Sequence, residues 1–440
     1  MILAFAATGI YAWQLFRDNL RIPTFCYVWA ASVVILVSGA VYREITGDRA
    51  FYVGGHGGTH WLTWAEYGNA ELAAGVGILC LALGHYWANR RSWNLSLPEF
   101  IDSRAPDPEH LRRWAFFLLL AGFVPLLATG VLNPVTLVRA LTHGRNLHGA
   151  VRYLSSEGTY FAFYNAFSNL VPFGVTATAI LLWGRKRPWV LLSVTGFLAL
   201  LLFLTGTRSA AAATLAPFVV LPRYMGNPRL FRKLAVIAVA GGFVLFTVQL
   251  DYRSAGFQHA QIGQALAHTN PIDTVDGYEL DWTGEAMHNY GSKFHFLDGQ
   301  SYFAVLVNPV PRIFWHKKPG GYSGANAANL GFGFGTTMTS AWMGEAYANF
   351  RWFGIPVVGL LAGVLMGILD VFIRRSGAFA MAVFLPLQFH WAFWVRGDSV
   401  SDFDTWLFGV ILLITAMIIL GPARAPDSAS DSPGAGEPAA

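Results

Sequence analysis

Residues 350–373 read FRWFGIPVVGLLAGVLMGILDVFI, a run that is apolar except for Arg351 and Asp370. An α-helix needs about 20 largely apolar residues to cross the hydrocarbon core of a bilayer, so this run is predicted to be a transmembrane helix. The same rule predicts about eleven spans and an all-α, polytopic helical membrane protein. The spans lie near 1–16, 23–42, 65–88, 114–134, 160–183, 189–205, 209–222, 234–250, 350–373, 377–395 and 404–420.

The composition also indicates a membrane protein. Of the 440 residues, 54% are hydrophobic and 12% are charged. Soluble domains carry about 25% charged residues, so most of this chain's surface is expected to face lipid. The net charge of +5 does not indicate a nucleic-acid partner, because positive residues of membrane proteins gather in cytoplasmic loops. Cys26 and Cys80 lie in apolar runs, which implies no disulfide framework.

The basic residues predict the orientation in the membrane. They occur at alternate connections, which the positive-inside rule places in the cytoplasm. These connections contain Arg17 and Arg21, Arg90 to Arg113, Arg185 to Arg187, Arg223 to Lys233, and Arg374 with Arg375. The N-terminus is then outside, and residues 1–16 are interpreted as a first span rather than a cleaved signal peptide. Residues 1–420 form a single membrane domain, followed by a disordered cytoplasmic tail, 421–440, rich in Pro, Ser and Ala.

One long external connection, residues 251–349, is the most informative part of the chain. Such long loops are usually functional or disordered, and its many aromatic residues argue against disorder. Residues 301–310 are apolar but too short to span, which fits a segment that dips back into the membrane. An acidic group is interpreted as a solvated face; it consists of Asp273, Asp276, Glu279, Asp281 and Glu285.

Several external basic residues break the positive-inside pattern. Arg208 lies at the turn of a helical hairpin, Arg253 lies where the eighth span emerges, and Arg312 and Lys318 lie on a Pro-rich strap. A guanidinium group binds phosphate through two parallel hydrogen bonds, so these residues are candidate phosphate ligands. Taken singly, each arginine is also explained by contact with lipid headgroups. Arg43 is external too, but it belongs to no motif, and we expect its replacement to be near neutral.

Glu345 precedes the ninth span, with Tyr347 and Asn349 close behind it. A carboxylate in a dry site is able to act as a general base toward an acceptor hydroxyl, and tyrosine and asparagine side chains hydrogen-bond sugar hydroxyls. The preference of a carboxylate for a helix N-terminus explains the position of Glu345 equally well. Asp402 and Asp404 are a weak metal-binding signal. Without a convincing ligand cluster, we expect neither a metal nor another cofactor.

Three motifs together resemble one family, the Wzy-type O-antigen polymerases, or oligosaccharide repeat-unit polymerases. The motifs are Gly206-Thr-Arg208-Ser209, Pro311-Arg312-Ile-Phe-Trp315-His-Lys-Lys318-Pro319 and Gly344-Glu345-Ala-Tyr347-Ala-Asn349-Phe350. The resemblance covers residues 200–370 and elsewhere rests on topology. It implies a GT-C-like polymerase/ligase fold, a multi-pass location in the bacterial inner membrane, and an active site that faces the periplasm.

The resemblance also implies the reaction and the residue roles. Such an enzyme polymerises polyprenyl-pyrophosphate-linked oligosaccharide repeat units into O-antigen, capsule or exopolysaccharide. Arg208, Arg253 and Arg312 match the basic positions expected to meet pyrophosphate, and Lys318 is a fourth. Glu345 and Arg312 are then the catalytic candidates, while Trp315, Tyr347 and Asn349 contact sugar. The segment Trp315-His316-Lys317 departs from the common Trp-Pro-x pattern, which leaves the geometry of the strap open.

Two alternatives stay open. An O-antigen ligase is usually marked by a histidine near the end of its large loop, and His316 is the candidate near the strap. A transporter or flippase of lipid-linked sugars would line its spans with charges, whereas the predicted span interiors are largely apolar. Sugar identity, linkage and stereochemistry are not predicted, and whether a chain-length regulator binds stays open. The expected partners are the lipid-linked oligosaccharide and membrane lipid.

Overall fold

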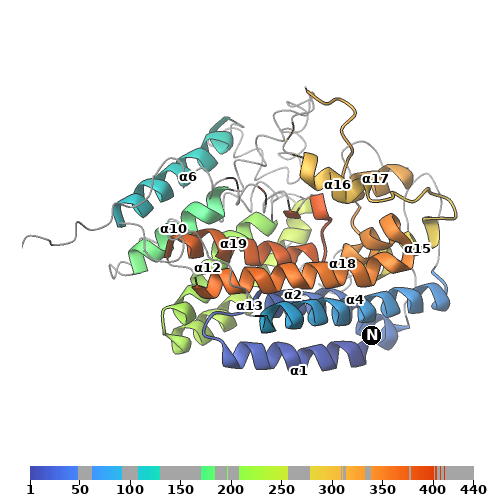
Figure 1. The fold of residues 1–440 in the computed structure, drawn as a ribbon, viewed down its shortest axis with the longest axis horizontal. Helices are drawn as coiled ribbons and strands as arrows, with labels where there is room; N and C mark the ends of the chain where they lie inside the picture. The colour runs from blue at the N-terminus through green and yellow to red at the C-terminus, as the bar shows by residue number, and fades with distance from the viewer. Residues whose placement is uncertain are drawn as a thin grey trace, which may run out of the picture.

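The chain folds into a bundle of helices with a layer of short helices across one end (Figure 1). A computed structural model describes residues 1–47, 62–91, 108–128, 170–183, 196, 208–255, 278–308, 310, 314–331, 338–375, 378–400, 402, 403, 407 and 411. Within these ranges every regular element is a helix, which confirms the all-α prediction. The spans predicted near 189–205 and 404–420, and the tail 421–440, lie outside the described residues apart from single positions.

Each remaining predicted span overlaps a helix, and residues 129–134 and 160–169 of two of these spans lie outside the described residues. The bundle consists of α1 (Ile2–Asp18), α2 (Thr24–Ser32), the π-helical η1 (Val33–Val37), α3 (Ser38–Thr46), α4 (Trp64–Arg90), α6 (Pro108–Ala128), α10 (Leu170–Trp183), α12 (Arg208–Tyr224), α13 (Pro228–Ala255), α18 (Ala341–Arg375) and α19 (Ala378–Trp394). In the described part, three helical segments are long and apolar enough to cross a membrane: Thr24–Thr46, Trp64–Arg90 and Ala341–Arg374. The count of eleven spans stays a prediction.

Helices α4 and α18 pack against each other through glycines. Gly84 of α4 faces the Leu360 carbonyl, and Gly363 of α18 faces the Leu81 carbonyl; at either glycine an added Cβ would overlap that oxygen. Gly367 faces Ala88 one turn further along, so the two helices run parallel. Small residues at such a seam let the backbones approach closely, which is how helices gain packing contacts in a lipid environment.

A buried polar cluster joins five helices near the C-terminal end of α18. Asp370 lies 2.8 Å from His85 Nε2 of α4 and accepts a 2.8 Å hydrogen bond from the Thr24 backbone N–H of α2. Tyr11 of α1 lies 2.8 Å from the other His85 ring nitrogen, and Gln388 of α19 donates to Thr24 at 3.1 Å. Buried charge inside a helical bundle is costly unless it is paired and hydrogen-bonded. The cluster therefore fixes these five helices relative to one another.

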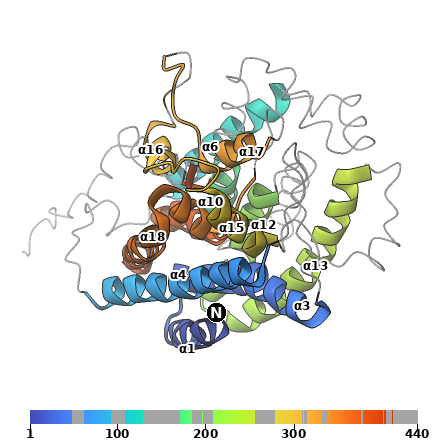
Figure 2. The same cartoon turned by 90° about the vertical axis from the view of Figure 1, so that its right-hand side faces the viewer.

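The opposite end of the bundle carries a cap made from the long connection. The cap contains α15 (Glu279–Asn289), α16 (Gln300–Val307) and α17 (Tyr322–Asn329). Figure 2 shows these helices with the right-hand side of Figure 1 facing the viewer. Ala286 of α15 lies against Gly344 of α18, and His288 pairs with Glu66 at the start of α4 at 2.5 Å. The described part of the connection, which includes 278–308 and 314–331, is thus folded, in agreement with its aromatic content.

Helix α18 is kinked at the cap. Phe350 (φ −133°, ψ 18°) and Arg351 (φ 59°, ψ −155°) are not helical. A positive φ is strained for a residue with a side chain, and such strain persists only where the surroundings enforce it. The kink separates residues 341–349, which pack with the cap, from the apolar stretch that the sequence predicts to span.

We predict that Gly363→Ala destabilises the bundle, because the added methyl group would overlap the Leu81 carbonyl. Overpacking of this kind costs about 1–3 kcal/mol. The measurement is thermal unfolding of the detergent-solubilised protein. Gly68→Ala on α4 is the matched control, since nothing lies within 4 Å of its added carbon. Equal melting temperatures for the two variants would show that the glycine seam does not limit stability.

Candidate functional site

The first turns of α18 place Glu345 at the centre of the cap, where it is fully buried. Its Oε1 atom accepts a 2.6 Å hydrogen bond from the Ser301 hydroxyl of α16. Its Oε2 atom accepts from the backbone N–H and the hydroxyl of Ser399, each at 2.8 Å. These neutral donors hold the carboxylate between α16 and the turn that follows α19.

Asn349 completes this connection one turn later. Its side-chain nitrogen donates to Ser301 Oγ at 2.7 Å and to the Glu345 carbonyl at 2.8 Å. We call Glu345, Asn349, Ser301 and Ser399 the Glu345 latch. Asn349 Oδ1 is buried and has no hydrogen-bond partner among the described residues. A spare buried acceptor of this kind is a position for a water or a ligand hydroxyl.

Two further carboxylates, Asp398 and Asp402, interact electrostatically with Glu345. Asp398 accepts hydrogen bonds from the Ser323 backbone N–H at 2.9 Å and hydroxyl at 2.7 Å, which anchors the start of α17. Burial, and then the charge of Asp398, raise the pKa of Asp402 well above its ordinary value. Among the described residues, no group of three His, Cys, Asp or Glu side chains is placed to hold a metal ion; Asp404 lies outside them.

The prediction of a solvated acidic face is wrong for the part that the structure describes. Glu279, Asp281 and Glu285 are all buried. Glu279 accepts from Thr339 Oγ1 and from the Ala341 backbone N–H, each at 3.0 Å. These partners are distant in sequence, so the residue types alone gave no sign of them. Asp273 and Asp276 lie outside the described residues.

The sequence does carry one signal for Glu285 that was missed. Residues 284–290, GEAMHNY, repeat the pattern of residues 344–350, GEAYANF. In both copies the asparagine follows the glutamate by one helical turn, and Asn289 Nδ2 donates to Glu285 Oε1 at 2.5 Å. In the first copy, burial raises the pKa of Tyr290 to about 12.

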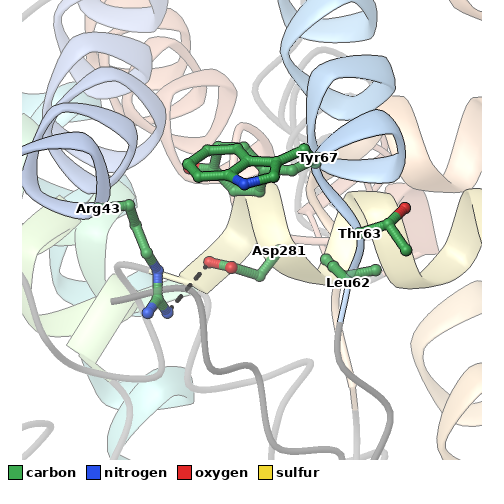
Figure 3. Close-up of a pocket in the computed structure, with 6 residues that line it drawn as sticks. Arg43, Leu62, Thr63, Tyr67 and Asp281 are labelled. Carbon is green, nitrogen blue, oxygen red and sulfur yellow. Dashed lines mark hydrogen bonds and ion pairs between the residues drawn. The ribbon is translucent and has the colours of Figure 1, made fainter. Parts of the chain in front are cut away.

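Arg43 pairs with a buried carboxylate inside the fold, so its replacement is not expected to be near neutral, contrary to the prediction from the sequence. It is buried, its Nη2 atom lies 3.4 Å from Asp281 Oδ2, and its guanidinium group lies 4.4 Å from the centre of the Tyr278 ring. Figure 3 shows this pair at a cavity lined by Leu62, Thr63 and Tyr67. The cavity volume is about 10 Å³, which holds at most one water molecule. It is therefore too small for a substrate.

The Pro-rich strap leaves α16 at Asn308 and is closed by Lys318. The ammonium group donates to the Asn308 carbonyl at 2.8 Å, to the Asn308 side-chain oxygen at 3.3 Å and to the Val310 carbonyl at 3.0 Å. Trp315 is partly exposed and contacts the Phe303 ring edge-on, with centroids 6.4 Å apart. Arg312 lies between these positions in sequence but outside the described residues.

The remaining candidates are placed less completely. Arg208 is the first residue of α12 and Arg253 lies in the last turn of α13, but their side chains are not described. Tyr347 is half-buried between Phe296 and Trp352. The structure thus brings Glu345 and Asn349 together at Ser301 of α16, which leads to the strap, whereas Tyr347 contacts Phe296 and Trp352 instead. Their roles toward a substrate stay predictions.

Sequence analysis also missed Arg351, which it placed inside the ninth span. The residue sits at the kink, its side chain is exposed, and its guanidinium group lies 4.7 Å from the centre of the Phe296 ring. An exposed arginine in a strained backbone position two residues after Asn349 is a candidate anion ligand. Comparisons of the chain with protein-family models, curated proteins and solved structures found no match.

We predict that Arg43→Met destabilises the protein by about 3–5 kcal/mol, because removing one partner leaves a buried charge without its counter-ion. The free energy of unfolding in detergent measures this. The paired replacement Arg43→Met with Asp281→Leu removes both charges and should recover most of the loss. A single variant as stable as the parent would mean that the fold does not depend on the Arg43–Asp281 pair.

We predict that Glu345→Gln lowers the unfolding free energy by about 1–3 kcal/mol. The new amide nitrogen is a donor, and one side of it must face either Ser301 or the two donors of Ser399. Glu44→Gln, an exposed carboxylate on α3, is the control and should change stability by less than about 0.5 kcal/mol. A Glu345→Gln protein of normal stability that has lost activity would contradict a holding role and favour the general-base role.

Proposed function

We propose that this chain is a membrane glycosyltransferase that polymerises polyprenyl-pyrophosphate-linked oligosaccharide repeat units. The observation that carries the proposal is that α16 connects two motifs far apart in sequence. Its first turn is bound to Glu345 and Asn349, and its end leads into the strap that Lys318 closes. Both motifs belong to the resemblance to Wzy-type polymerases, and a shared packing element is what a common site requires.

The strap is proposed to present a cation to the leaving group. When the anomeric carbon leaves its carrier, negative charge builds on the pyrophosphate, and preorganised cations aimed at that charge lower the barrier. Arg312 lies in sequence between Asn308 and Val310 on one side and Lys318, which binds them, on the other, and it is the proposed cation. Arg208 and Arg253 are the proposed further ligands, and Arg351 joins them as an exposed arginine beside the latch.

Lys318 receives a different role from the one its charge suggests. An ammonium group has three donors, and three oxygen atoms of Asn308 and Val310 lie within hydrogen-bond distance. We therefore assign Lys318 to positioning the strap rather than to direct contact with pyrophosphate.

Glu345 is likewise a positioning residue in this arrangement. Both carboxylate oxygens accept hydrogen bonds from serines, and the side chain has no contact with solvent. General-base chemistry at Glu345 requires Ser301 or Ser399 to move aside and admit the acceptor hydroxyl. Once the site is open, Asn349 Oδ1, a buried acceptor without a hydrogen-bond partner among the described residues, is the candidate contact for a sugar hydroxyl.

The direction of the helices supports the proposed sidedness, with the cap facing the periplasm across the bacterial inner membrane. Helices α4 and α18 run parallel, as the alternation of basic connections requires. Arg223 of α12 donates to the Asn19 carbonyl at 2.8 Å, and Arg21 donates to the Ile373 carbonyl. These predicted cytoplasmic residues gather at the end of α18 that lies away from the cap.

A flippase is the second candidate, because the His85–Asp370 pair places charge inside the bundle. The oxygens of Asp370, however, already accept hydrogen bonds from Thr24, Gln388 and His85. A saturated cluster offers no free site to a moving sugar or ion. The pair therefore fits a structural role better than a transport route.

The glycan profile of a deletion strain tests the proposal. A polymerase defect leaves capped single repeats, whereas a ligase defect leaves polymer on the carrier lipid and a flippase defect leaves no repeats outside. Complementation with Arg312→Ala should slow chain growth by about 2–4 kcal/mol of barrier, and Arg312→Lys should also impair it because the planar fork is lost. Lys317→Ala, an exposed neighbour on the strap, is the control. Normal polymer from Arg312→Ala at normal abundance would contradict the role of the strap.

A further inference from the structure

Helix α16 has an inverted distribution of side chains for a helix in water. Ser301 and Ala304 are buried against α18, while Phe303 and Leu306 on the other face are 49% and 72% exposed. A helix on the surface of a soluble cap would turn its apolar face inward and its polar face outward. With eight residues, α16 is about 12 Å long, too short to cross a bilayer.

The strap extends this exposed apolar surface. Phe314 is 80% exposed, Val310 is exposed, and Trp315 contacts Phe303. We call Phe303, Leu306, Val310, Phe314 and Trp315 the α16–strap patch. Contiguous exposed surfaces of this kind mark interaction sites, whereas scattered single residues do not.

The patch lies next to the kink of α18. Tyr302 stacks on Phe350 at the kink, with centroids 5.8 Å apart and ring planes 3° apart. Beyond the kink, Phe353 and Leu361 of α18 are also exposed. In both views α18 lies between α16 and α4, so α16 stands on the outside of the bundle (Figures 1 and 2). Exposed apolar side chains thus occur both in the patch and on the candidate span that α16 contacts.

We propose that the α16–strap patch inserts into the bilayer leaflet on the cap side, with lipid acyl chains as its occupant. The composition fits an interfacial anchor: apolar side chains, a tryptophan and the exposed Lys317, which suits anionic headgroups. The inference needs α18 to cross the membrane but does not depend on the reaction catalysed.

The test measures lipid and water access at single labelled positions. Leu306→Cys and Phe314→Cys are made in the full chain with Cys26 and Cys80 replaced by alanine, labelled with a fluorophore, and reconstituted in phosphatidylcholine–phosphatidylglycerol vesicles. Quenching by brominated acyl chains reports lipid contact, and quenching by iodide reports water contact. Leu361→Cys on the exposed face of α18 is the lipid reference, and Lys293→Cys on the cap is the water reference.

We expect labels at 306 and 314 to be quenched by brominated lipid at least half as strongly as the label at 361, and to be shielded from iodide. The label at 293 should show the reverse. Iodide quenching at 306 and 314 equal to that at 293 would overturn the proposal. Shielding from both quenchers would also overturn it, because the occupant would then be protein. If the label at 361 itself behaved like the one at 293, the span assignment, and the proposal with it, would be wrong.

Discussion

The close approach of α4 and α18 is the constraint on which the other contacts depend. Carbonyl oxygens of Leu81 and Leu360 lie where a side chain at Gly363 or Gly84 would otherwise be. The seam sets the separation of the two helices along most of their length. Because the helices run parallel, it also brings the start of α18 beside the start of α4, where α15 packs on both. The cap can form only on this pre-aligned end.

Polar clusters at the two ends of α18 then fix its neighbours. His85 and Asp370 join the helices at one end, and the Glu345 latch joins α16 and the turn after α19 at the other. Each cluster is surrounded by apolar packing, where an unmade hydrogen bond costs more than in water. Their near-complete pairing makes the helix arrangement specific, while the glycine seam makes it compact.

The three helical segments of the described residues that are long and apolar enough to cross a membrane were predictable, because each is a local run of apolar residues, as the agreement of 65–88 with α4 shows. The choice of Glu345 and Asn349 as candidate site residues was possible from their motif, but their burial was not predictable. Ser301 and Ser399 lie 44 and 54 residues from Glu345 in the chain, and a serine carries no pattern that marks it as a partner. The prediction that replacing Arg43 is near neutral was wrong for the same reason, since its partner Asp281 lies 238 residues away in the chain. Long-range pairing of polar residues has no sequence period, unlike a helix or a span.

The kink at Phe350 and Arg351 separates the part of α18 that packs with the cap from its apolar run. A straight helix through this point would continue the axis of the span into the cap, and its side chains would keep helical spacing. Instead the positive φ of Arg351 breaks the helix immediately after Asn349, so the latch belongs to the cap while the next residues belong to the apolar run. Strain of about 1–3 kcal/mol at such a residue persists only when neighbouring contacts over-determine it. The Tyr302–Phe350 stack and the Arg351–Phe296 contact hold the backbone in this strained conformation, one at each of the two non-helical residues. Any movement of α16 that opened the latch would therefore also release the kink, which couples access to Glu345 to the position of the strap.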